Sequence, residues 1–300
     1  MKYLVTGGTG FIGLNIVLRL INECHDVTIT GHDAEQKIPN FRGKILQPSF
    51  LGIDWDEIEY FDAVFHQAAI NDTTLQDRKE LFRSNVESSE KLFRNVIRQG
   101  CKKIVYASST AIYGNSPAPY KEGITPFDPL NPYAESKIAL EQMVSRLETE
   151  YPDVLFVGLR YCNVYGPREN HKGKRATMIY QLAQQIKKGN PTLFKWGEQK
   201  RDYIYVQDVV DANILALDAQ QNCVVNCGSG ISTSFNDLVS ILSKIMNVQR
   251  ETQFTNNPYT ATYQNHTECD MSLAEKMLKF KPSHDIKTGI QKYYESGFLV

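Results

Sequence analysis

A tyrosine and a lysine stand four residues apart in residues 131–137, which read Asn-Pro-Tyr-Ala-Glu-Ser-Lys. The segment favours a helix, so the side chains of Tyr133 and Lys137 are expected on one helical face. An ammonium group beside a phenol stabilises the phenolate, and we expect it to lower the tyrosine pKa from its usual value of about 10. The pair is therefore a candidate for taking and returning a proton near neutral pH.

A glycine-rich turn near the start of the chain predicts a dinucleotide site. Residues 2–6 are a short apolar run, and residues 7–13 read Gly-Gly-Thr-Gly-Phe-Ile-Gly, followed by apolar residues in a helical pattern. Strand, turn and helix in this order let the backbone approach a pyrophosphate at the helix N-terminus. The residues expected to bind the cofactor here are Gly7, Gly10, Phe11, Ile12 and Gly13.

The end of the second predicted strand, residues 26–30, leaves the cofactor open between NAD and NADP. An acidic residue often binds the adenosine ribose at this point, but this chain has Gly31. The missing carboxylate leaves room for a 2′-phosphate, which His32 or Lys37 would meet. Asp33 is still able to reach a ribose, so it is also a candidate cofactor contact.

Strand and helix patterns alternate along the first half of the chain. Further strands are predicted at 44–47, 63–68, 103–108 and 155–160, and helices at 79–99 and 133–150. This alternation predicts an α/β fold, a Rossmann-type doubly wound parallel sheet with helices on both faces. A smaller, interleaved C-terminal α/β substrate domain is expected to contain helices at 178–188, 235–246 and 272–278. The expected boundaries are 1–165 plus about 203–228 for the dinucleotide-binding domain, and about 166–202 and 229–300 for the substrate-binding domain.

Composition narrows the class of protein. The chain has 300 residues, enough for such a pair of domains, and its 33 Lys and Arg against 34 Asp and Glu give a net charge of −1. No general basic field therefore favours nucleic acid, and no apolar run reaches the roughly 18 residues of a membrane span. The six cysteines form no C-x-x-C pair, which favours buried thiols over a metal site. We expect a cytoplasmic enzyme without a metal, a nucleic-acid partner or a membrane partner.

Two further motifs complete a family resemblance. Residues 108–114 read Ser-Ser-Thr-Ala-Ile-Tyr-Gly after a predicted strand, and residues 62–69 read Asp-Ala-Val-Phe-His-Gln-Ala-Ala. With the glycine turn and the Tyr133–Lys137 pair, they resemble the extended short-chain dehydrogenase/reductase superfamily over essentially the whole chain. The resemblance implies a catalytic Ser109 besides that pair, although Ser109 alone could be a turn serine. The cofactor contacts that it implies are Ala68, Ala69, Tyr133 and Lys137.

The second half of the chain is most similar to the ADP-glycero-manno-heptose 6-epimerase family. The resemblance rests on residues 160–173, which include the run His-Lys-Gly, and on Lys-Arg-Asp-Tyr-Ile-Tyr at 200–205 and Tyr-Gln at 263–264. It nominates Lys172 as a second catalytic base, but residues 171–175 are also a basic loop that would attract a diphosphate. The substrate contacts that it implies are Thr73, Ser109, Asn163, His171, Lys172, Arg201 and Tyr263.

The chain departs from related enzymes at three places. Thr110 and Ala111 stand where sugar-nucleotide dehydratases have Asp and Glu, so dehydration is disfavoured. Gly31 and His32 replace the usual Asp-Asn of the 6-epimerases, and Thr262 replaces an arginine. These two departures concern the cofactor and the nucleotide sugar respectively.

The resemblance implies an NAD(P)-dependent nucleotide-sugar epimerase, which oxidises a sugar carbon transiently and returns the hydride to its opposite face. A UDP-hexose 4-epimerase and a nucleotide-sugar 4-reductase of the same superfamily are alternatives, and a non-catalytic NAD(P) sensor is a third. In this superfamily the helices equivalent to 79–99 and 133–150 pair across a two-fold axis, so a homodimer is expected.

Overall fold

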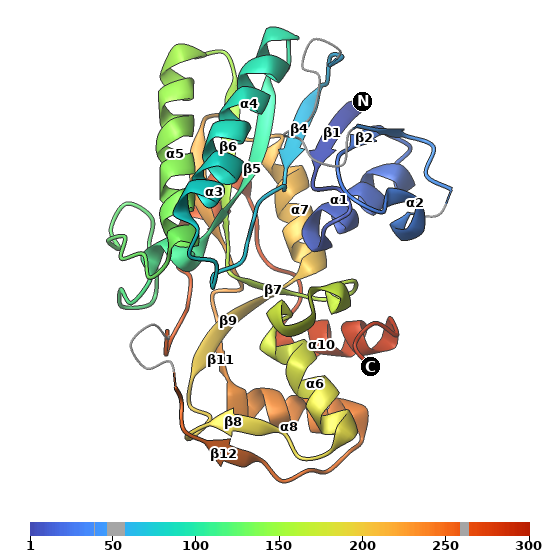
Figure 1. Ribbon diagram of the computed structural model, residues 1–300, viewed down its shortest axis with the longest axis vertical. Coiled ribbons are helices and arrows are strands. Elements are labelled where there is room, and N and C mark those ends of the chain that lie inside the picture. The colour runs from blue at the N-terminus through green and yellow to red at the C-terminus, as the bar shows by residue number, and fades with distance from the viewer. Residues whose placement is uncertain (39, 47–57, 259–263) are drawn as a thin grey trace.

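A seven-stranded sheet, parallel throughout, forms the upper half of the molecule (Figure 1). The computed structural model describes residues 1–38, 40–46, 58–258 and 264–300. The strand order is β10-β6-β5-β4-β1-β2-β3, so the order along the chain reverses between β1 and β4, where ligands of such sheets bind. The strands are β1 (Lys2–Thr6), β2 (Asp26–Ile29), β3 (Lys44–Ile45), β4 (Ala63–His66), β5 (Lys103–Ser109), β6 (Leu155–Tyr161) and β10 (Cys223–Cys227).

Helices cover both faces of this sheet, as the sequence predicted. One hydrophobic core joins it to α1 (Phe11–Asn22), α7 (Val206–Ala216) and α9 (Ser272–Leu278). The core on the other face includes buried residues of α4 (Ser88–Arg98) and α5 (Pro132–Glu150), which lie side by side in Figure 1. Strands that are buried on both faces explain why their sequences read as continuous apolar runs. The doubly wound Rossmann-type fold is confirmed.

The helix expected at 79–99 is interrupted by a wider turn, which corrects that prediction. It consists of α3 (Arg78–Phe82), a π-helical turn η3 (Arg83–Glu87) and α4. The Ser88 hydroxyl donates to the carbonyl oxygen of Arg83 at 2.8 Å, five residues earlier. Buried polar side chains in this turn bond the backbone or neighbouring segments instead of lying on a regular helical face.

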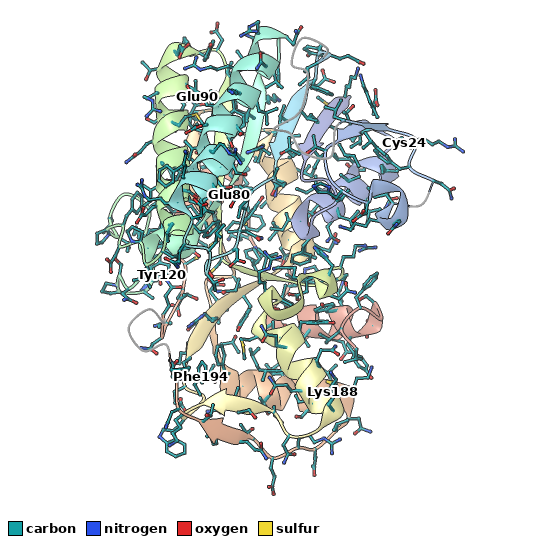
Figure 2. The ribbon with its side chains drawn as sticks, in the orientation of Figure 1. Cys24, Glu80, Glu90, Tyr120, Lys188 and Phe194 are labelled. Atoms are coloured by element: carbon teal, nitrogen blue, oxygen red, sulfur yellow. The ribbon has the colours of Figure 1, made fainter. Side chains whose placement is uncertain are left out.

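The described residues of the lower half form two small sheets and three α-helices. The three-stranded sheet has the order β11-β9-β7, and β8 pairs with β12. The elements are β7 (Asn163–Tyr165), β8 (Thr192–Phe194), β9 (Lys200–Tyr205), β11 (Ser232–Ser234), β12 (Gln253–Thr255), α6 (Met178–Lys188), α8 (Phe235–Met246) and α10 (Ile286–Glu295). A separate core packs α6, α8 and α10 together, and Figure 2 marks this half by Lys188 and Phe194. Because β9 lies here while α7 and β10 belong to the upper half, the chain passes repeatedly between the two.

Candidate active site

A cavity of about 640 Å³ lies at the carboxyl ends of the upper strands and extends to the lower half. Most of the predicted site residues line it, although they come from segments as far apart as the glycine turn and β9. These are Gly7, Gly10, Phe11, Ile12, Gly13, Ala68, Ala69, Ser109, Tyr133, Lys137, Asn163, His171, Lys172 and Arg201. The residues expected to bind a dinucleotide and the residues expected to move protons therefore line one cavity.

The glycine turn packs its backbone closely against the start of α1. A Cβ atom on Gly13 would lie 2.2 Å from the carbonyl oxygen of Gly7, so only glycine permits the close packing of helix on turn. Gly10 caps α1 without a side-chain hydrogen bond, and in α1, which is described in full, the first turn holds no acidic residue. The helix N-terminus thus keeps its amide groups and positive end for an anion. These residues fit a bound dinucleotide.

Gly31 at the end of β2 is a position that only glycine fits. Its φ is +152°, and a Cβ atom there would lie 2.1 Å from Oγ1 of Thr9, so a side chain at this position would collide with Thr9. His32 and Asp33 are exposed and lie outside the cavity walls. Lys37, at the end of α2 (Ala34–Lys37), donates from Nζ to the carbonyl oxygen of Thr9 at 3.2 Å. Its ammonium group is therefore held beside the glycine turn.

Tyr133 is set in the first turn of α5 by its local sequence. The Asn131 side chain accepts a hydrogen bond from the backbone of Ala134 at 3.0 Å, and Pro132 follows the cap. The Tyr133 ring is buried, and Ser109 lies close enough to its hydroxyl to lower its pKa. Ser109 also accepts from the backbone of Ala111 at 3.1 Å, so it caps the turn η4 (Thr110–Tyr113) as well.

The electrostatics of Tyr133 and Lys137 correct one prediction. Burial raises the pKa of Tyr133, and the hydrogen bond from Ser109 only partly opposes this. The Lys137 Nζ atom lies 5.9 Å from the centre of the Tyr133 ring and donates to the carbonyl oxygen of Ala107 at 2.8 Å. Burial lowers the Lys137 pKa to about 8, against the opposing charge of Glu141. The predicted lowering of the tyrosine pKa is thus wrong for this state of the protein, because loss of hydration dominates.

Asn85 is a buried residue that the sequence did not single out. Its side chain accepts from the backbone of Ile70 at 2.8 Å and donates to the carbonyl oxygen of Ile70 at 3.0 Å. It also donates to the Ser136 hydroxyl at 3.0 Å, which in turn donates to the carbonyl oxygen of Tyr133 at 2.7 Å. Asn85 therefore ties the loop after β4 to the helix that carries Tyr133.

The lower wall of the cavity includes η5 (Asn170–Arg175), which carries His171 and Lys172. The buried Glu169 anchors this segment, since its carboxylate accepts from the backbone of Thr177 at 2.7 Å and from the backbone of Gly166 at 3.3 Å. Burial lowers the Lys172 pKa, although the charge of Glu169 opposes the shift. The Lys172 Nζ atom lies 5.2 Å from the centre of the Phe11 ring, so it faces the residue that opens α1.

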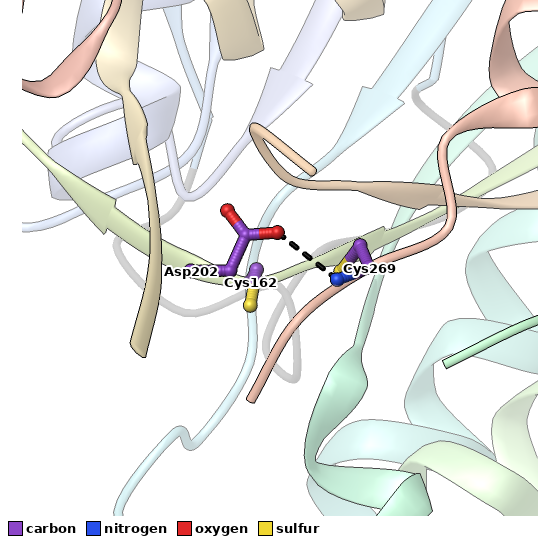
Figure 3. A group of neighbouring side chains, drawn as sticks. All are labelled: Cys162, Asp202 and Cys269. Atoms are coloured by element: carbon purple, nitrogen blue, oxygen red, sulfur yellow. Dashed lines mark hydrogen bonds between the residues drawn. The ribbon is translucent and has the colours of Figure 1, made fainter. Parts of the chain in front are cut away.

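Asn163 and Arg201 lie beside a group of buried polar side chains. Asn163 donates to the carbonyl oxygen of Asp202 at 2.8 Å, which joins β7 to β9. Figure 3 shows Asp202 next to Cys162 and Cys269, which are close enough to be considered as metal ligands. The Asp202 carboxylate, however, accepts two hydrogen bonds from Ser229 and one each from the backbones of Gly230 and Cys269, at 2.6 to 3.1 Å. These bonds give Asp202 a structural role.

The cavity walls differ from the predicted site at several residues. Thr73 lies outside the cavity walls, and Asn71 from the same loop lines them instead. Thr262 and Tyr263 lie outside the described residues. Thr110 and Ala111 do not line the cavity. Arg175, from the basic loop that the sequence indicated, also lines the cavity. Other lining residues that were not predicted as site residues are Gln67, Ala107, Ser108, Tyr161, Cys162, Val164, Ala176, Thr177, Met178, Gln181, Tyr203 and Phe235.

Comparison with known proteins agrees with this geometry. The model of the NAD-dependent epimerase/dehydratase family matches residues 3–228. ADP-L-glycero-D-manno-heptose-6-epimerase of Brachyspira hyodysenteriae is 30% identical, with 97% of this chain and 96% of the relative covered. The enzyme of the same name from Helicobacter pylori has a crystal structure that matches with a TM-score of 0.87 and 31% identity, covering 98% of this chain and 96% of that one.

A different epimerase matches equally well in shape. The structure of UDP-N-acetylglucosamine 4-epimerase from Methanobrevibacter ruminantium gives a TM-score of 0.90 at 29% identity, covering 98% of this chain and 97% of the other. Among the residues that the structure describes, no helix has the length and apolar character needed to cross a bilayer.

Proposed function

We propose that this chain, which belongs to the NAD-dependent epimerase/dehydratase family, inverts one carbon of a nucleotide sugar by transient oxidation. The observation that carries the proposal is that Ser109, Tyr133 and Lys137 line the same cavity as the glycine turn. A hydroxyl held near Tyr133 would also lie near the place where the turn holds a dinucleotide, which is what hydride transfer to NAD requires.

Each of the three side chains has a distinct role in the proposal. In its phenolate form, Tyr133 takes the proton of the sugar hydroxyl and later returns it. Ser109 holds the sugar oxygen, and Lys137 binds the nicotinamide ribose and stabilises the negative charge of the phenolate. The bound nicotinamide supplies the hydride chemistry. Lys172 is proposed as the proton-handling group for the other face of the sugar.

The charge of the cavity supports an anionic substrate. Its described lining residues include Lys137, Lys172, Arg175 and Arg201 but no aspartate or glutamate. The diphosphates of a dinucleotide and of a nucleotide sugar would both be attracted to such a wall. Asn163 and Arg201 are proposed to contact the nucleotide sugar.

An ADP-heptose 6-epimerase activity is the first choice of substrate. It is supported by the residues 160–173 and by the two relatives of that name at 30% and 31% identity. A UDP-hexose 4-epimerase activity is the alternative, since a 4-epimerase has a TM-score of 0.90. The test is to incubate the purified protein with ADP-heptose, UDP-hexose and GDP-sugar panels and to identify products by NMR. Inversion of one carbon is expected, and no product from any panel would contradict the proposal.

Two controls distinguish an epimerase from a nucleotide-sugar 4-reductase and from a non-catalytic NAD(P) sensor. An epimerase is expected to co-purify with its cofactor and to consume no added NADPH, whereas a 4-reductase would consume NADPH in proportion to product. Tyr133→Phe should lower kcat by roughly 10²- to 10⁴-fold, the usual contribution of a positioned proton-transfer group. A Tyr133→Phe variant with unchanged biological function would favour a sensor.

Lys37 is proposed to decide how well the site accepts NADP beside NAD. Its ammonium group donates to the carbonyl oxygen of Thr9, and Thr9 lies against Gly31 at the end of β2, where the adenosine ribose and any 2′-phosphate are expected. Lys37→Ala should weaken NADP binding more than NAD binding in titration calorimetry, and Lys44→Ala on β3 is the matched control. Equal weakening of both cofactors would contradict this role. Gly31→Asp is unsuitable as a test, because the new side chain would collide with Thr9.

A cytoplasmic location is also proposed. All six cysteines are free thiols, and three of them are buried. Unpaired thiols suit a reducing compartment.

A further inference from the structure

Glu141 lies on the same face of α5 as the two residues proposed to move the proton. It follows Lys137 by four residues and Tyr133 by eight, so the three side chains are stacked along one helical face. Its carboxylate accepts hydrogen bonds from the Ser108 hydroxyl at 2.5 Å and from Nε and Nη2 of Arg160 at 2.9 and 2.7 Å. Ser108 lines the cavity, next to Ser109.

The Glu141–Arg160 ion pair is buried and is hydrogen-bonded to neighbouring side chains. The side chains are only 9% and 7% exposed, which sets this ion pair apart from the surface pairs of the described chain. The register of β5 and β6 places Ser108 directly opposite Arg160. Arg160 also donates to the Tyr113 hydroxyl at 2.7 Å, and Tyr113 donates to Asn226 at 2.9 Å. A carboxylate held by three donors has one fixed position in the low-dielectric interior.

Glu141 is the charged side chain that raises the pKa of Lys137. The titratable groups on the neighbouring strands are neutral. On β4, His66 is hydrogen-bonded to Thr6 and Ser89, and its pKa falls to about 3 through burial and the charge of Lys137. His66 is therefore neutral. On β5, burial raises the pKa of Tyr106 well above its usual value, so it is neutral as well.

On α5 itself, Glu141 is the charged neighbour of Lys137. Tyr133 is neutral because burial raises its pKa. The Ala107 carbonyl accepts from the Lys137 ammonium group but carries no net charge. Glu141 is thus the anionic side chain whose field opposes the loss of hydration at Lys137.

We propose that Glu141, fixed by Arg160 and Ser108, is a positioning residue whose charge keeps Lys137 protonated beside the reacting tyrosine. Because only the ammonium form stabilises charge on Tyr133, this arrangement would keep the catalytic group active up to the pH at which Lys137 loses its proton. The inference rests on the proposed function for its kinetic consequence. The protonation state of Lys137 can be measured separately, without substrate.

The decisive variant is Glu141→Gln, which removes the charge but keeps the shape. The pKa of Lys137 is expected to fall by about one unit, since a close opposite charge changes a pKa by about that much or more. In [13Cε]lysine NMR, assigned with Lys137→Met, the Lys137 resonance should titrate about one unit lower. In kinetics, kcat should fall about fivefold at pH 8 and less than twofold at pH 6.5, with KM nearly unchanged.

Matched variants separate charge from stability. Glu148→Gln removes another carboxylate from α5, two turns further along, and should leave the Lys137 titration unchanged. Glu141→Gln leaves the buried guanidinium of Arg160 without its charged partner. If this prevents folding, the double variant Glu141→Gln with Arg160→Gln replaces the ion pair by two neutral side chains. Glu141→Asp should restore most of the Lys137 titration.

Two outcomes would overturn the proposal. The first is a Lys137 titration that is the same in folded Glu141→Gln, or in the neutral double variant, as in the wild type. The second is a fall in kcat that is equal at pH 6.5 and pH 8, which would indicate a structural role only. If the NMR shift occurs but no nucleotide sugar is converted by any variant or by the wild type, the proposed function fails while the electrostatic link holds.

Discussion

Burial acts in opposite directions on the pKa values of Tyr133 and Lys137. It raises the pKa of the phenol and lowers that of the ammonium group to about 8, because both charged forms lose hydration. Near neutral pH the protein without ligands therefore holds a neutral tyrosine beside a protonated lysine. The nearby Lys137 ammonium group alone therefore does not ionise Tyr133 in the protein without ligands.

The first prediction concerns this resting state. Ultraviolet difference titration of the ligand-free protein, compared with Tyr133→Phe, should show no ionisation of Tyr133 below about pH 10, the ordinary pKa of tyrosine. The sign follows from burial, since a raised pKa moves ionisation to higher pH. Phenolate absorbance that appears near pH 7 and is lost in Tyr133→Phe would contradict this account.

Lys172 carries the second prediction, because its position fits two roles. Burial lowers its pKa, as a base requires, but its Nζ atom lies 5.2 Å from the Phe11 ring at the start of α1, close to where a pyrophosphate would lie. Lys172→Met should lower kcat at least tenfold if the lysine is a base, since a proton-transfer group contributes to the transition state. Lys188→Met, at the exposed end of α6, is the control.

The alternative outcome for Lys172 is equally specific. If KM for the substrate or Kd for the cofactor rises while kcat stays near wild type, Lys172 binds phosphate. The assignment to 6-epimerases then weakens, since it depends in part on residues 171–173.

At the level of elements, the glycine turn is where backbone geometry most directly limits the site. Gly13→Ala places a Cβ atom 2.2 Å from the carbonyl oxygen of Gly7, so the helix or the turn must move. A loss of about 1–3 kcal/mol in the free energy of unfolding is expected, together with loss of the bound dinucleotide. Gly189→Ala, whose Cβ atom would meet nothing within 4 Å, should change stability by less than about 0.5 kcal/mol. Chemical denaturation and retained cofactor measure both effects, and equal behaviour of the two variants would contradict the prediction.

The upper sheet was predictable because its signals are local in the sequence. The β1 strand, glycine turn and α1 follow one another directly, and each buried strand is a short apolar run. The short strands of the lower half, such as β8 and β12, were missed. Their three residues carry no periodic pattern, and they are held by pairing with distant segments.

The site was predictable where a motif carries the chemistry and unpredictable where only the fold brings residues together. Ser109, Tyr133 and Lys137 were found from their spacing and their family resemblance, and they do line one cavity. Asn85 and Glu141 were not found, because their roles depend on contacts with Ile70, Ser136, Ser108 and Arg160. The pKa of Tyr133 was misjudged for the same reason, since burial depends on the whole chain.

For the whole molecule, the expected homodimer depends on the outer face of α3, η3, α4 and α5. No large hydrophobic side chain that the structure describes as exposed lies on these helices. Arg94 bridges Glu90 on α4 and Glu150 on α5, and Figure 2 marks Glu80 and Glu90 on this side. An interface here would be polar, so its affinity should depend on salt.

The last prediction follows from that surface. Light scattering at micromolar concentration and low salt should give twice the chain mass of 34.1 kDa, and the mass should fall toward that of one chain near 1 M salt. Arg83→Glu reverses the charge at an exposed position on η3, within the face expected to form the dimer, and should weaken the dimer by breaking ion pairs made across that face. Lys244→Glu on α8 reverses a charge in the lower half and should leave the mass unchanged. A single-chain mass at low salt would contradict the dimer, and equal effects of the two variants would place the interface elsewhere.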